Sequence, residues 1–284
     1  MPVKFRIFIK IFVLIFIAGL FCQCSKTEVE KSDEDWSFVV LGDQRQGYGV
    51  YGKLVKYISN YEPSPKLAVG LGDIMLKPGN EAEWLNFWRY SKPLTDKMPL
   101  FIVRGNHEGN DPVYEQILHE QANIPGANFY YSCCSEDTYF IILDTEIRGE
   151  ERSIVNEQLF WLANKLDSVS LEPNIKNIFI FTHQPVFPQG KFQDSPLINA
   201  EELHELFLEN NKVKAIFGAH EHMFNRYERD GLTYIISGGA GAILHHGYGG
   251  NYYHFVKVSF YQEEERINIK TIGIFNEVIE EFDL

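Results

Sequence analysis

The sequence has few cysteines, and their spacing is not that of a structural framework. Among 284 residues the only cysteines are Cys22, Cys24, Cys133 and Cys134. Neighbouring residues of a strand point to opposite faces, so a bridge between Cys133 and Cys134 would be strained. The spacing therefore argues against a disulfide scaffold and against a zinc finger. We expect Cys133 and Cys134 to be ordinary residues of a strand within 130–134.

Basic residues are also in the minority. The 26 lysines and arginines are outnumbered by 39 acidic residues, which gives a net charge of −13. A protein that binds nucleic acid over a broad surface needs basic side chains to neutralise the phosphates. The acidic balance therefore argues against a broad nucleic-acid-binding surface. The sequence contains no internal repeat or low-complexity tract, which leaves an ordinary globular protein.

The first residues differ from the rest of the chain. Lys4, Arg6 and Lys10 precede an apolar run over 11–21, and a polar segment follows. A basic head, a short apolar stretch and a polar segment are typical of an export signal. The apolar run is short for a membrane-spanning helix, although an uncleaved anchor is the alternative. In either case we expect the chain to be exported.

A cysteine at the end of the apolar run resembles a bacterial lipoprotein signal, in which that cysteine is lipidated and becomes the mature N-terminus. Cys22 and Cys24 could both take this place. We favour Cys24, because a polar run that can serve as a tether begins directly after it. The sequence then divides into a signal over 1–24, a tether over 25–35 and a domain over 36–284. We expect a lipid-anchored membrane protein on the periplasmic or cell-surface side.

Beyond the tether, short apolar runs alternate with amphipathic helical patterns. Near-continuous apolar strands favour sheets that are covered on both faces, with helices outside. The expected strands cover 37–41, 67–71, 100–103, 139–143, 178–181, 215–217, 234–236, 255–261 and 267–275. The expected helices cover 51–61, 81–91, 112–121, 155–168 and 201–210. The pattern predicts a single α/β domain.

Side chains that can bind metals follow five of these strands directly. The segments are Gly42-Asp43, Gly72-Asp73, Gly105-Asn106-His107-Glu108, Thr182-His183 and Gly218-Ala219-His220-Glu221-His222. In open α/β sheets the ligand crevice lies beyond the carboxyl ends of the strands, so we expect these side chains to meet at one rim. Carboxylates, an amide oxygen and imidazoles suit Mn, Fe, Zn or similar ions. Each segment alone also fits a turn or a structural histidine, but their order and placement together favour a metal site.

This ordered set resembles the calcineurin-like metallophosphoesterase superfamily, and within it bacterial proteins similar to purple acid phosphatases. The resemblance covers about residues 36–240. It implies an α/β fold, a two-sheet β-sandwich flanked by helices in an α/β/β/α arrangement. It also implies two divalent or trivalent metal ions as cofactors. The implied reaction is hydrolysis of a small phosphomonoester or phosphodiester by a metal-activated hydroxide.

The resemblance also implies a role for each of these side chains. Asp73 would bridge the two metal ions, and His107 would lie beside the phosphate, where it either donates a proton to the leaving oxygen or stabilises the transition state. The other ligands would be Asn106, His183 and His220 at the second metal, and Asp43 and His222 at the first.

Two departures from the family pattern concern the first metal. Where the common pattern has a histidine two residues after Asp43, this chain has Arg45, which cannot be a ligand. Where purple acid phosphatases have a tyrosine three residues after Asp73, this chain has Leu76. Arg45 could hold a substrate phosphate through its planar fork, or pair with a carboxylate. The alternative to an enzyme is therefore a non-catalytic, lipid-anchored binding protein with a degenerate metal site.

Overall fold

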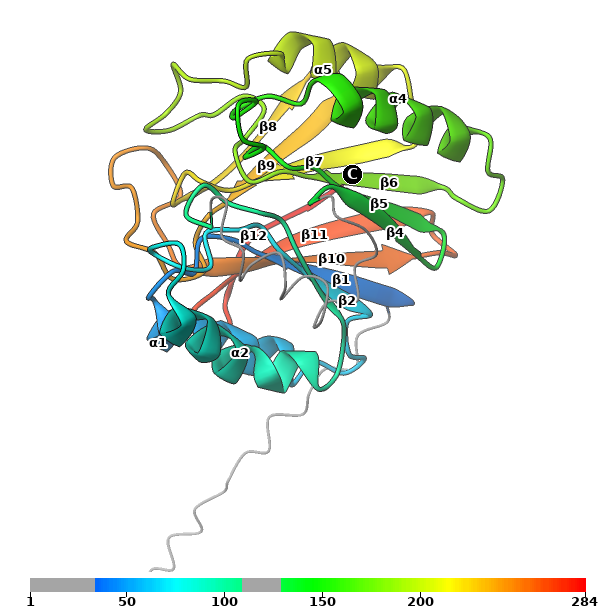
Figure 1. Ribbon diagram of the computed structural model, residues 1–284. Coiled ribbons are helices and arrows are strands. Elements are labelled where there is room, and N and C mark those ends of the chain that lie inside the picture. The colour runs from blue at the N-terminus through cyan, green and yellow to red at the C-terminus, as the bar shows by residue number, and fades with distance from the viewer. Residues whose placement is uncertain (1–33, 109–128) are drawn as a thin grey trace, which may run out of the picture. The chain divides into compact units, whose positions relative to one another are not determined.

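Two six-stranded sheets form the centre of the fold in the computed structural model, which describes residues 34–108 and 129–284 (Figure 1). The first sheet contains β1 (Trp36–Leu41), β2 (Leu67–Gly70), β3 (Leu100–Ile102), β10 (His254–Tyr261), β11 (Arg266–Gly273) and β12 (Val278–Asp283). The second contains β4 (Tyr131–Ser135), β5 (Thr138–Ile142), β6 (Asn177–Phe181), β7 (Val213–Gly218), β8 (Phe224–Arg229) and β9 (Leu232–Ser237). Their orders are β12-β11-β10-β1-β2-β3 and β4-β5-β6-β7-β9-β8.

Parallel strands lie at the heart of both sheets. In the first sheet β1 pairs with β2 and β2 with β3 in parallel, and in the second β5, β6, β7 and β9 are parallel neighbours. Antiparallel strands complete the sheets: β10, β11 and β12 on one side of the first sheet, and β4 and β8 at the two edges of the second. Every residue of β1 and β6 is buried, as expected for parallel strands covered on both faces. The parallel arrangement brings the carboxyl ends of these strands to a common edge.

Helices cover the outer face of each sheet (Figure 1). The helices α1 (Tyr48–Ile58) and α2 (Glu81–Thr95) lie on the first sheet, and α4 (Asn156–Ser170) and α5 (Ala200–Leu208) lie on the second. The apolar stripe of α4 is buried through Leu162 and Leu166, in one cluster with Leu203 and Phe207 of α5. This arrangement confirms the predicted α/β fold, a two-sheet β-sandwich flanked by helices.

Aromatic side chains fill the space between the sheets. Phe38 of β1 points at the second sheet, where its ring lies 5.0 Å from that of Phe140 and 5.1 Å from that of Phe179, both in edge-to-face geometry. Such pairs contribute about 0.5–1.5 kcal/mol each beyond their burial. The rings of Phe181 and Phe217 continue this layer toward the strand ends, stacked at 5.3 Å. The packed core fixes the two sheets, and with them the two sets of strand ends.

Two strands were missing from the sequence prediction. β8 carries charged, partly exposed side chains, and β12 is an exposed edge strand, so neither has a continuous apolar run. The predicted strand over 267–275 ends earlier, at Gly273, because a turn with Asn276 in the left-handed region leads into β12. Cys133 and Cys134 lie in β4 with free thiols, as predicted.

The expected signal over 1–24, most of the tether over 25–35 and the expected helix over 112–121 lie outside the described residues. In the part of the chain that the structure describes, no helix has the length and apolar character needed to cross a membrane.

Candidate metal centre

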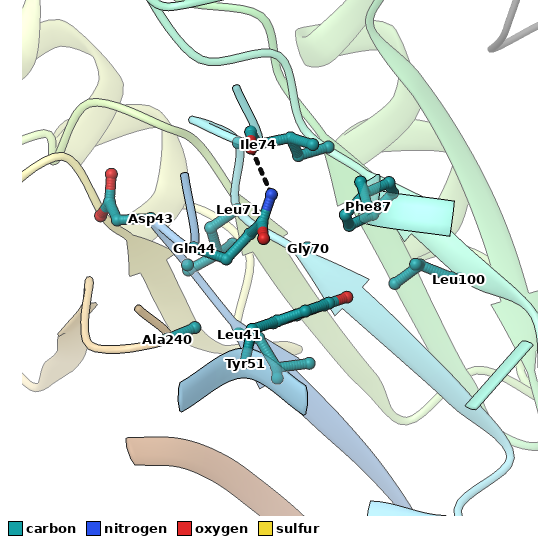
Figure 2. A pocket seen from close by; sticks show the side chains of 12 residues that line it. Leu41, Asp43, Gln44, Tyr51, Gly70, Leu71, Ile74, Phe87, Leu100 and Ala240 are labelled. Atoms are coloured by element: carbon teal, nitrogen blue, oxygen red, sulfur yellow. Dashed lines mark hydrogen bonds between the residues drawn. The ribbon is translucent and has the colours of Figure 1, made fainter. Parts of the chain in front are cut away.

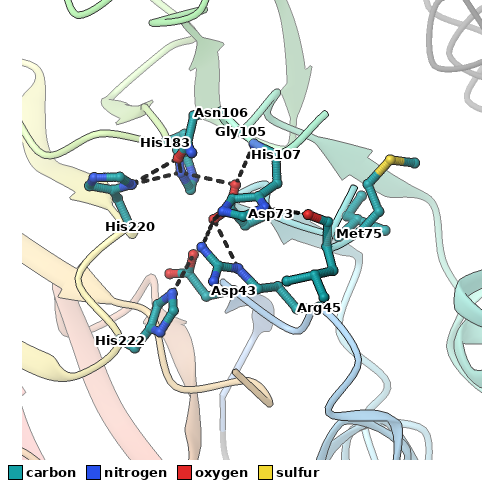
Figure 3. A network of polar contacts seen from close by, with 12 residues as sticks. Asp43, Arg45, Asp73, Met75, Gly105, Asn106, His107, His183, His220 and His222 are labelled. Carbon is teal, nitrogen blue, oxygen red and sulfur yellow. Dashed lines mark hydrogen bonds and ion pairs between the residues drawn. The ribbon is translucent and has the colours of Figure 1, made fainter. Parts of the chain in front are cut away.

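The polar side chains at the strand ends meet at one rim, formed by both sheets (Figure 3). β1 is followed by Asp43, β2 by Asp73, β3 by Asn106 and His107, β6 by His183, and β7 by His220 and His222. Two groups of possible metal ligands result, and the donor atoms of each lie within 4.8 Å of one another. The first group is Asp43, Asp73 and His222, and the second is Asp73, His183 and His220. Asp73 belongs to both, so one carboxylate could serve two ions.

The second group is tightly convergent. The Nε2 atom of His183 lies 3.3 Å from Oδ1 of Asp73 and 3.0 Å from Oδ1 of Asn106. The Nδ1 atom of His220 lies 2.9 Å from the same Asn106 oxygen and 3.3 Å from Nε2 of His183. Four donor atoms from four strand ends therefore face a common point. A carboxylate, an amide oxygen and two imidazoles form a suitable set for a divalent ion.

The first group has the character of a site built for a cation. Asp43 is fully buried, and neither of its carboxylate oxygens accepts a hydrogen bond within the described residues. The Nε2 atom of His222 is buried, equally without a hydrogen bond in that part of the chain, and lies 3.7 Å from Oδ1 of Asp43. Buried polar atoms without partners are costly, and a bound metal ion would satisfy all three.

Backbone carbonyls orient two of the imidazoles. Nδ1 of His183 donates to the carbonyl of Leu71 at 2.8 Å, and Nδ1 of His222 donates to the carbonyl of Ile243 at 2.7 Å. A carbonyl can only accept, so each ring carries a proton on Nδ1 and directs Nε2 toward the carboxylates. This is the arrangement found around metal-ligating histidines. The residues present therefore fit a pair of metal ions.

The backbone turns sharply at three of the candidate ligands. Asp43, Asp73 and His220 all adopt left-handed conformations, with φ of 58°, 53° and 63°. Gly72 precedes Asp73 with φ of 88°, a conformation that glycine adopts without a steric penalty. Gly105 is needed for space, because a Cβ there would lie 2.3 Å from the backbone nitrogen of Asp73. The two loops after β2 and β3 can therefore touch.

Glu108 locks these two loops together, a role that the sequence analysis did not assign. Its fully buried carboxylate accepts backbone N–H groups from Asp73 at 2.9 Å, Ile74 at 2.7 Å and Gly105 at 2.8 Å. Burial and the nearby charge of Asp73 raise the pKa of Glu108 to about 7. The only signal in the sequence is that an acidic residue directly follows the Asn106-His107 pair.

Arg45 occupies the position where a histidine ligand was missing. Its Nη2 atom lies 2.7 Å from Oδ2 of Asp73 and its Nε atom lies 3.2 Å from the same oxygen. Of the two uses that the sequence left open, the structure shows the pairing with a carboxylate. Burial alone would raise the pKa of Asp73, but the charges of His183, Arg45 and His107 hold it below its usual range. For Asp43 burial dominates and raises the pKa well above its usual range.

His107 lies at the open side of the centre. Its backbone N–H donates to Oδ1 of Asp73 at 3.0 Å, and its Nε2 lies 3.9 Å from Oδ2 of the same carboxylate. Its Nδ1 donates to the carbonyl of Leu76 at 2.7 Å, which holds the ring in place. The ring is only partly buried, so a substrate can reach it. Leu76 thus contributes a backbone acceptor at the position where purple acid phosphatases have a tyrosine.

Behind Asp43 lies a small pocket that belongs to the packing of the fold (Figure 2). Its volume is about 10 Å³, room for about one water molecule. Apolar side chains such as Tyr51 and Phe87 line it, and Gln44 donates to the carbonyl of Ile74 within it (Figure 2). The hydrogen bond from Gln44 to Ile74 ties the loop after β2 to the segment after β1.

This chain has the fold of metal-dependent phosphoesterases. It also has their paired groups of aspartate and histidine at the strand ends. Residues 37–224 match the calcineurin-like phosphoesterase family, and the chain belongs to this family.

Comparison with known proteins gives distant relatives. The chain is 24% identical over 205 residues to serine/threonine-protein phosphatase CPPED1 of Danio rerio, covering 67% of this chain and 64% of that protein. It is 23% identical over 169 residues to purple acid phosphatase 22 of Arabidopsis thaliana, covering 56% and 38%. The chain thus spans less than two thirds of the length of these relatives. The structure of purple acid phosphatase PPD1 from Lupinus luteus has the same fold, with a TM-score of 0.71, 17% identity, and coverage of 87% of this chain and 53% of that one.

Proposed function

We propose that this chain is a metal-dependent hydrolase of small phosphomonoesters or phosphodiesters. The observation that carries the proposal is the pair of ligand groups that share Asp73. Membership of the calcineurin-like phosphoesterase family supports the same class of reaction. The cofactors would be two divalent or trivalent ions, and the oxygen and nitrogen donors suit Mn, Fe or Zn. When bound, such a pair polarises a phosphoryl oxygen and lowers the pKa of an attacking water.

The proposed ligands are those brought together at the rim. Both ions would share Asp73. One ion would also be held by Asn106, His183 and His220. The other would also be held by Asp43 and His222. Asn106 is exposed, whereas the carboxylates are fully buried, so the centre opens to solvent on the Asn106 side. A substrate phosphate would approach from that side.

Two further side chains would act on the substrate directly. His107 holds its Nε2 3.9 Å from Oδ2 of the shared Asp73 and would hold or donate the proton that the leaving oxygen needs. The side chain of Arg45 is 21% exposed and would bind non-bridging phosphate oxygens through its planar fork. Both groups already touch Asp73, so they lie within reach of the same phosphate.

The test is hydrolysis of 4-nitrophenyl phosphate and bis(4-nitrophenyl) phosphate by residues 30–284 with Mn²⁺, Fe²⁺ or Zn²⁺ supplied. Asp73→Asn and Asn106→Ala should each reduce kcat/KM by about a thousandfold, because the first removes the charge of the shared carboxylate and the second removes a ligand oxygen near the phosphate. The matched controls are Asp167→Asn and Asn164→Ala on the exposed face of α4. Unchanged hydrolysis in either ligand variant would contradict the proposal.

A non-catalytic binding protein is the second candidate, and the ion pair between Arg45 and Asp73 favours it. A guanidinium on the shared carboxylate leaves less room for an ion beside Asp43 and His222. Metal counting by mass spectrometry separates the two candidates. Two ions per chain with hydrolysis of the aryl phosphates support the enzyme. One ion or none, without hydrolysis of any phosphoester, supports the binding protein.

We also propose that the protein is an exported bacterial lipoprotein that is anchored through Cys24 on the periplasmic or cell-surface side. The support is the basic head and apolar run that precede Cys24. Growth of cells with a radiolabelled fatty acid should label the full chain and place it in the membrane fraction. Cys24→Ser should remove the label, and Cys22→Ser should retain it. The reverse pattern would assign the lipid to Cys22, and no label in the wild-type chain would overturn the anchor.

A further inference from the structure

A cavity of about 370 Å³ opens directly beside the second ligand group. Asn106 and His220 belong to its lining, so a group that fills the cavity would lie next to a phosphate at the proposed centre. Its other walls come from the segment after β5 and the segment after β6. The volume is sufficient for a small organic group. The position suits the alcohol part of a phosphoester.

The segment after β6 is a fixed wall. The fully buried carboxylate of Glu221 accepts backbone N–H groups from Gln189 at 2.7 Å, Gly190 at 2.8 Å and Phe192 at 2.9 Å. A Cβ at Gly190 would lie 2.7 Å from the side chain of Met223, so the backbone is packed against its neighbours. The ring of Phe192 stacks on that of His220 at 4.5 Å. The cavity therefore has a preformed apolar side.

The segment after β5 contributes a carboxylate, Glu146, to the lining of the cavity. Glu146 is 7% exposed, and both side-chain hydrogen bonds to its carboxylate, from Thr145 and Gln184, reach the same oxygen, Oε1. Within residues 34–108 and 129–284, no lysine or arginine forms an ion pair with it, and no hydrogen bond reaches Oε2. Burial raises the pKa of Glu146, and the nearby charge of His183 offsets part of this rise.

The remaining charges of the cavity do not offset this carboxylate. Glu151 also lines the cavity. Arg152 is the basic residue in the lining, and its Nη2 already donates to the carbonyl of Pro196 at 2.9 Å. The lining thus has one more negative than positive charge. Away from the metal ions of the proposed centre, this lining would repel a second anionic group and attract a cation.

We propose that this cavity is the subsite for a cationic alcohol group of the substrate, with Glu146 as its counter-ion and Phe192 as its apolar wall. The inference rests on the proposed function and deepens it, because it names the substrate class as phosphate esters of amino alcohols. Glu146 is thereby a specificity-determining residue. The phosphate lies on the Asn106 side, and the ammonium group lies toward the segment after β5.

The test compares two substrates of equal shape and different charge. Choline phosphate carries a quaternary ammonium, and 3,3-dimethylbutyl phosphate has a carbon atom in place of that nitrogen. The expected kcat/KM of the wild-type chain is about tenfold higher for choline phosphate, the order expected of a partly screened ion pair. This comparison needs no variant, so it does not depend on the folding of any mutant.

Glu146→Gln keeps the size of the side chain and an oxygen for Thr145 and Gln184, and removes the charge. The ratio of the two kcat/KM values should fall toward one. The control is Glu263→Gln, which changes the net charge equally. Glu263 lies in the turn between β10 and β11, at the opposite end of β1 from the site, because Trp36 pairs with Phe260. The control should keep the wild-type ratio.

Binding provides a measurement that is independent of catalysis. Calorimetric titration of the metal-free protein with both esters should show tighter binding of choline phosphate, and Glu146→Gln should abolish the difference. Equal hydrolysis and equal binding of the two esters would overturn the subsite and leave the hydrolase proposal intact. Failure to hydrolyse any phosphoester, with the binding preference present, would overturn the hydrolase and keep the subsite. A lower metal content in Glu146→Gln would assign Glu146 to the metal centre and overturn the inference.

Discussion

Arg45 directs two nitrogens at a single oxygen of Asp73, Nη2 at 2.7 Å and Nε at 3.2 Å from Oδ2. Asp73 is the carboxylate that both ligand groups share. The guanidinium therefore competes with a metal ion for that oxygen, while Asp43 and His222 keep their donor atoms without partners in the described part of the chain. The first ligand group therefore has both of its carboxylates, Asp43 and Asp73, and the positive charge of Arg45 lies against Asp73.

We therefore expect Arg45→His to strengthen metal binding at the first group. Histidine removes the competing charge and supplies a neutral nitrogen, so the weaker of the two metal affinities should rise about tenfold or more. Titration with Mn²⁺ or Zn²⁺, followed by metal counting after dialysis, measures the change. Arg89→His on the exposed side of α2 is the control for loss of one positive charge. Equal or weaker binding in Arg45→His would show that the ion pair does not limit the site.

Glu108 offers a second prediction, because its carboxylate holds the loops that carry Asp73 and Asn106. Glu108→Gln replaces one accepting oxygen with an N–H₂ group that faces backbone donors. The free energy of unfolding should fall by about 1–3 kcal/mol, the range for leaving a buried hydrogen-bonding group without its partner. Urea unfolding measures it, with Glu263→Gln as the exposed control. A loss below about 0.5 kcal/mol, the usual range for surface changes, would mean that the loops hold without Glu108.

The strand ends were predictable because the relevant signal is local. A run of apolar residues followed by Gly-Asp or by a histidine marks both the strand and the point where it enters the crevice, as at Leu71 and Asp73. The parallel order of the strands then places the side chains together. The strand pattern therefore predicted an α/β domain and the residues that meet at its rim, and the family resemblance implied the two-sheet sandwich.

The partners of these residues could not be predicted, because they depend on how separate loops approach. Nothing in the sequence shows that Glu108 faces the backbone of Asp73, or that Glu221 holds Gly190 and Phe192. Backbone N–H groups are present at every residue, so only the folded geometry decides which ones a buried carboxylate meets. Arg45 is the intermediate case, where the sequence left a phosphate and a carboxylate as possible partners.

A buried ion pair links the two sheets near the site and gives a third prediction. Arg104 and Asp144 are 2% and 0% exposed, and Nε of the arginine lies 3.1 Å from Oδ1 of the aspartate. Arg104→Met should cost about 3–5 kcal/mol because it leaves a buried carboxylate without a cation. The double variant Arg104→Met, Asp144→Leu should cost less than the sum of the single changes.

Thermal or urea unfolding of the two single variants and the double variant forms the cycle that tests this coupling. Lys92→Met is the control, since Lys92 and Asp96 form an exposed ion pair of 2.6 Å on α2. Such pairs contribute about 0–1 kcal/mol. Additive costs in the Arg104 and Asp144 cycle would show that the pair is not coupled.

His254 gives a prediction for the dependence of stability on pH. It is fully buried in β10, where Nδ1 donates to the carbonyl of Tyr252 at 3.0 Å and Nε2 lies 3.0 Å from Oγ of Ser237. The neutral ring thus has a partner at each nitrogen. Burial lowers the pKa of His254 to about 4, from an ordinary value near 6.5.

The direction of the pH dependence of stability is set by whether the folded or the unfolded chain takes up the proton first as the pH falls. Below about pH 6.5 the unfolded chain binds a proton at His254 and the folded chain does not, so the free energy of unfolding falls as the pH decreases toward 4. Between these two pH values, His254 alone lowers the free energy of unfolding by about 3 kcal/mol. Urea unfolding between pH 7 and pH 4.5, in a chelator that keeps metal from the strand-end histidines, should show a shallower decline in His254→Gln than in the wild type. His246→Gln, at an exposed histidine, should retain the wild-type slope. Parallel curves for the wild type and His254→Gln would show that His254 takes up its proton equally in the folded and unfolded states, which its buried hydrogen bonds argue against.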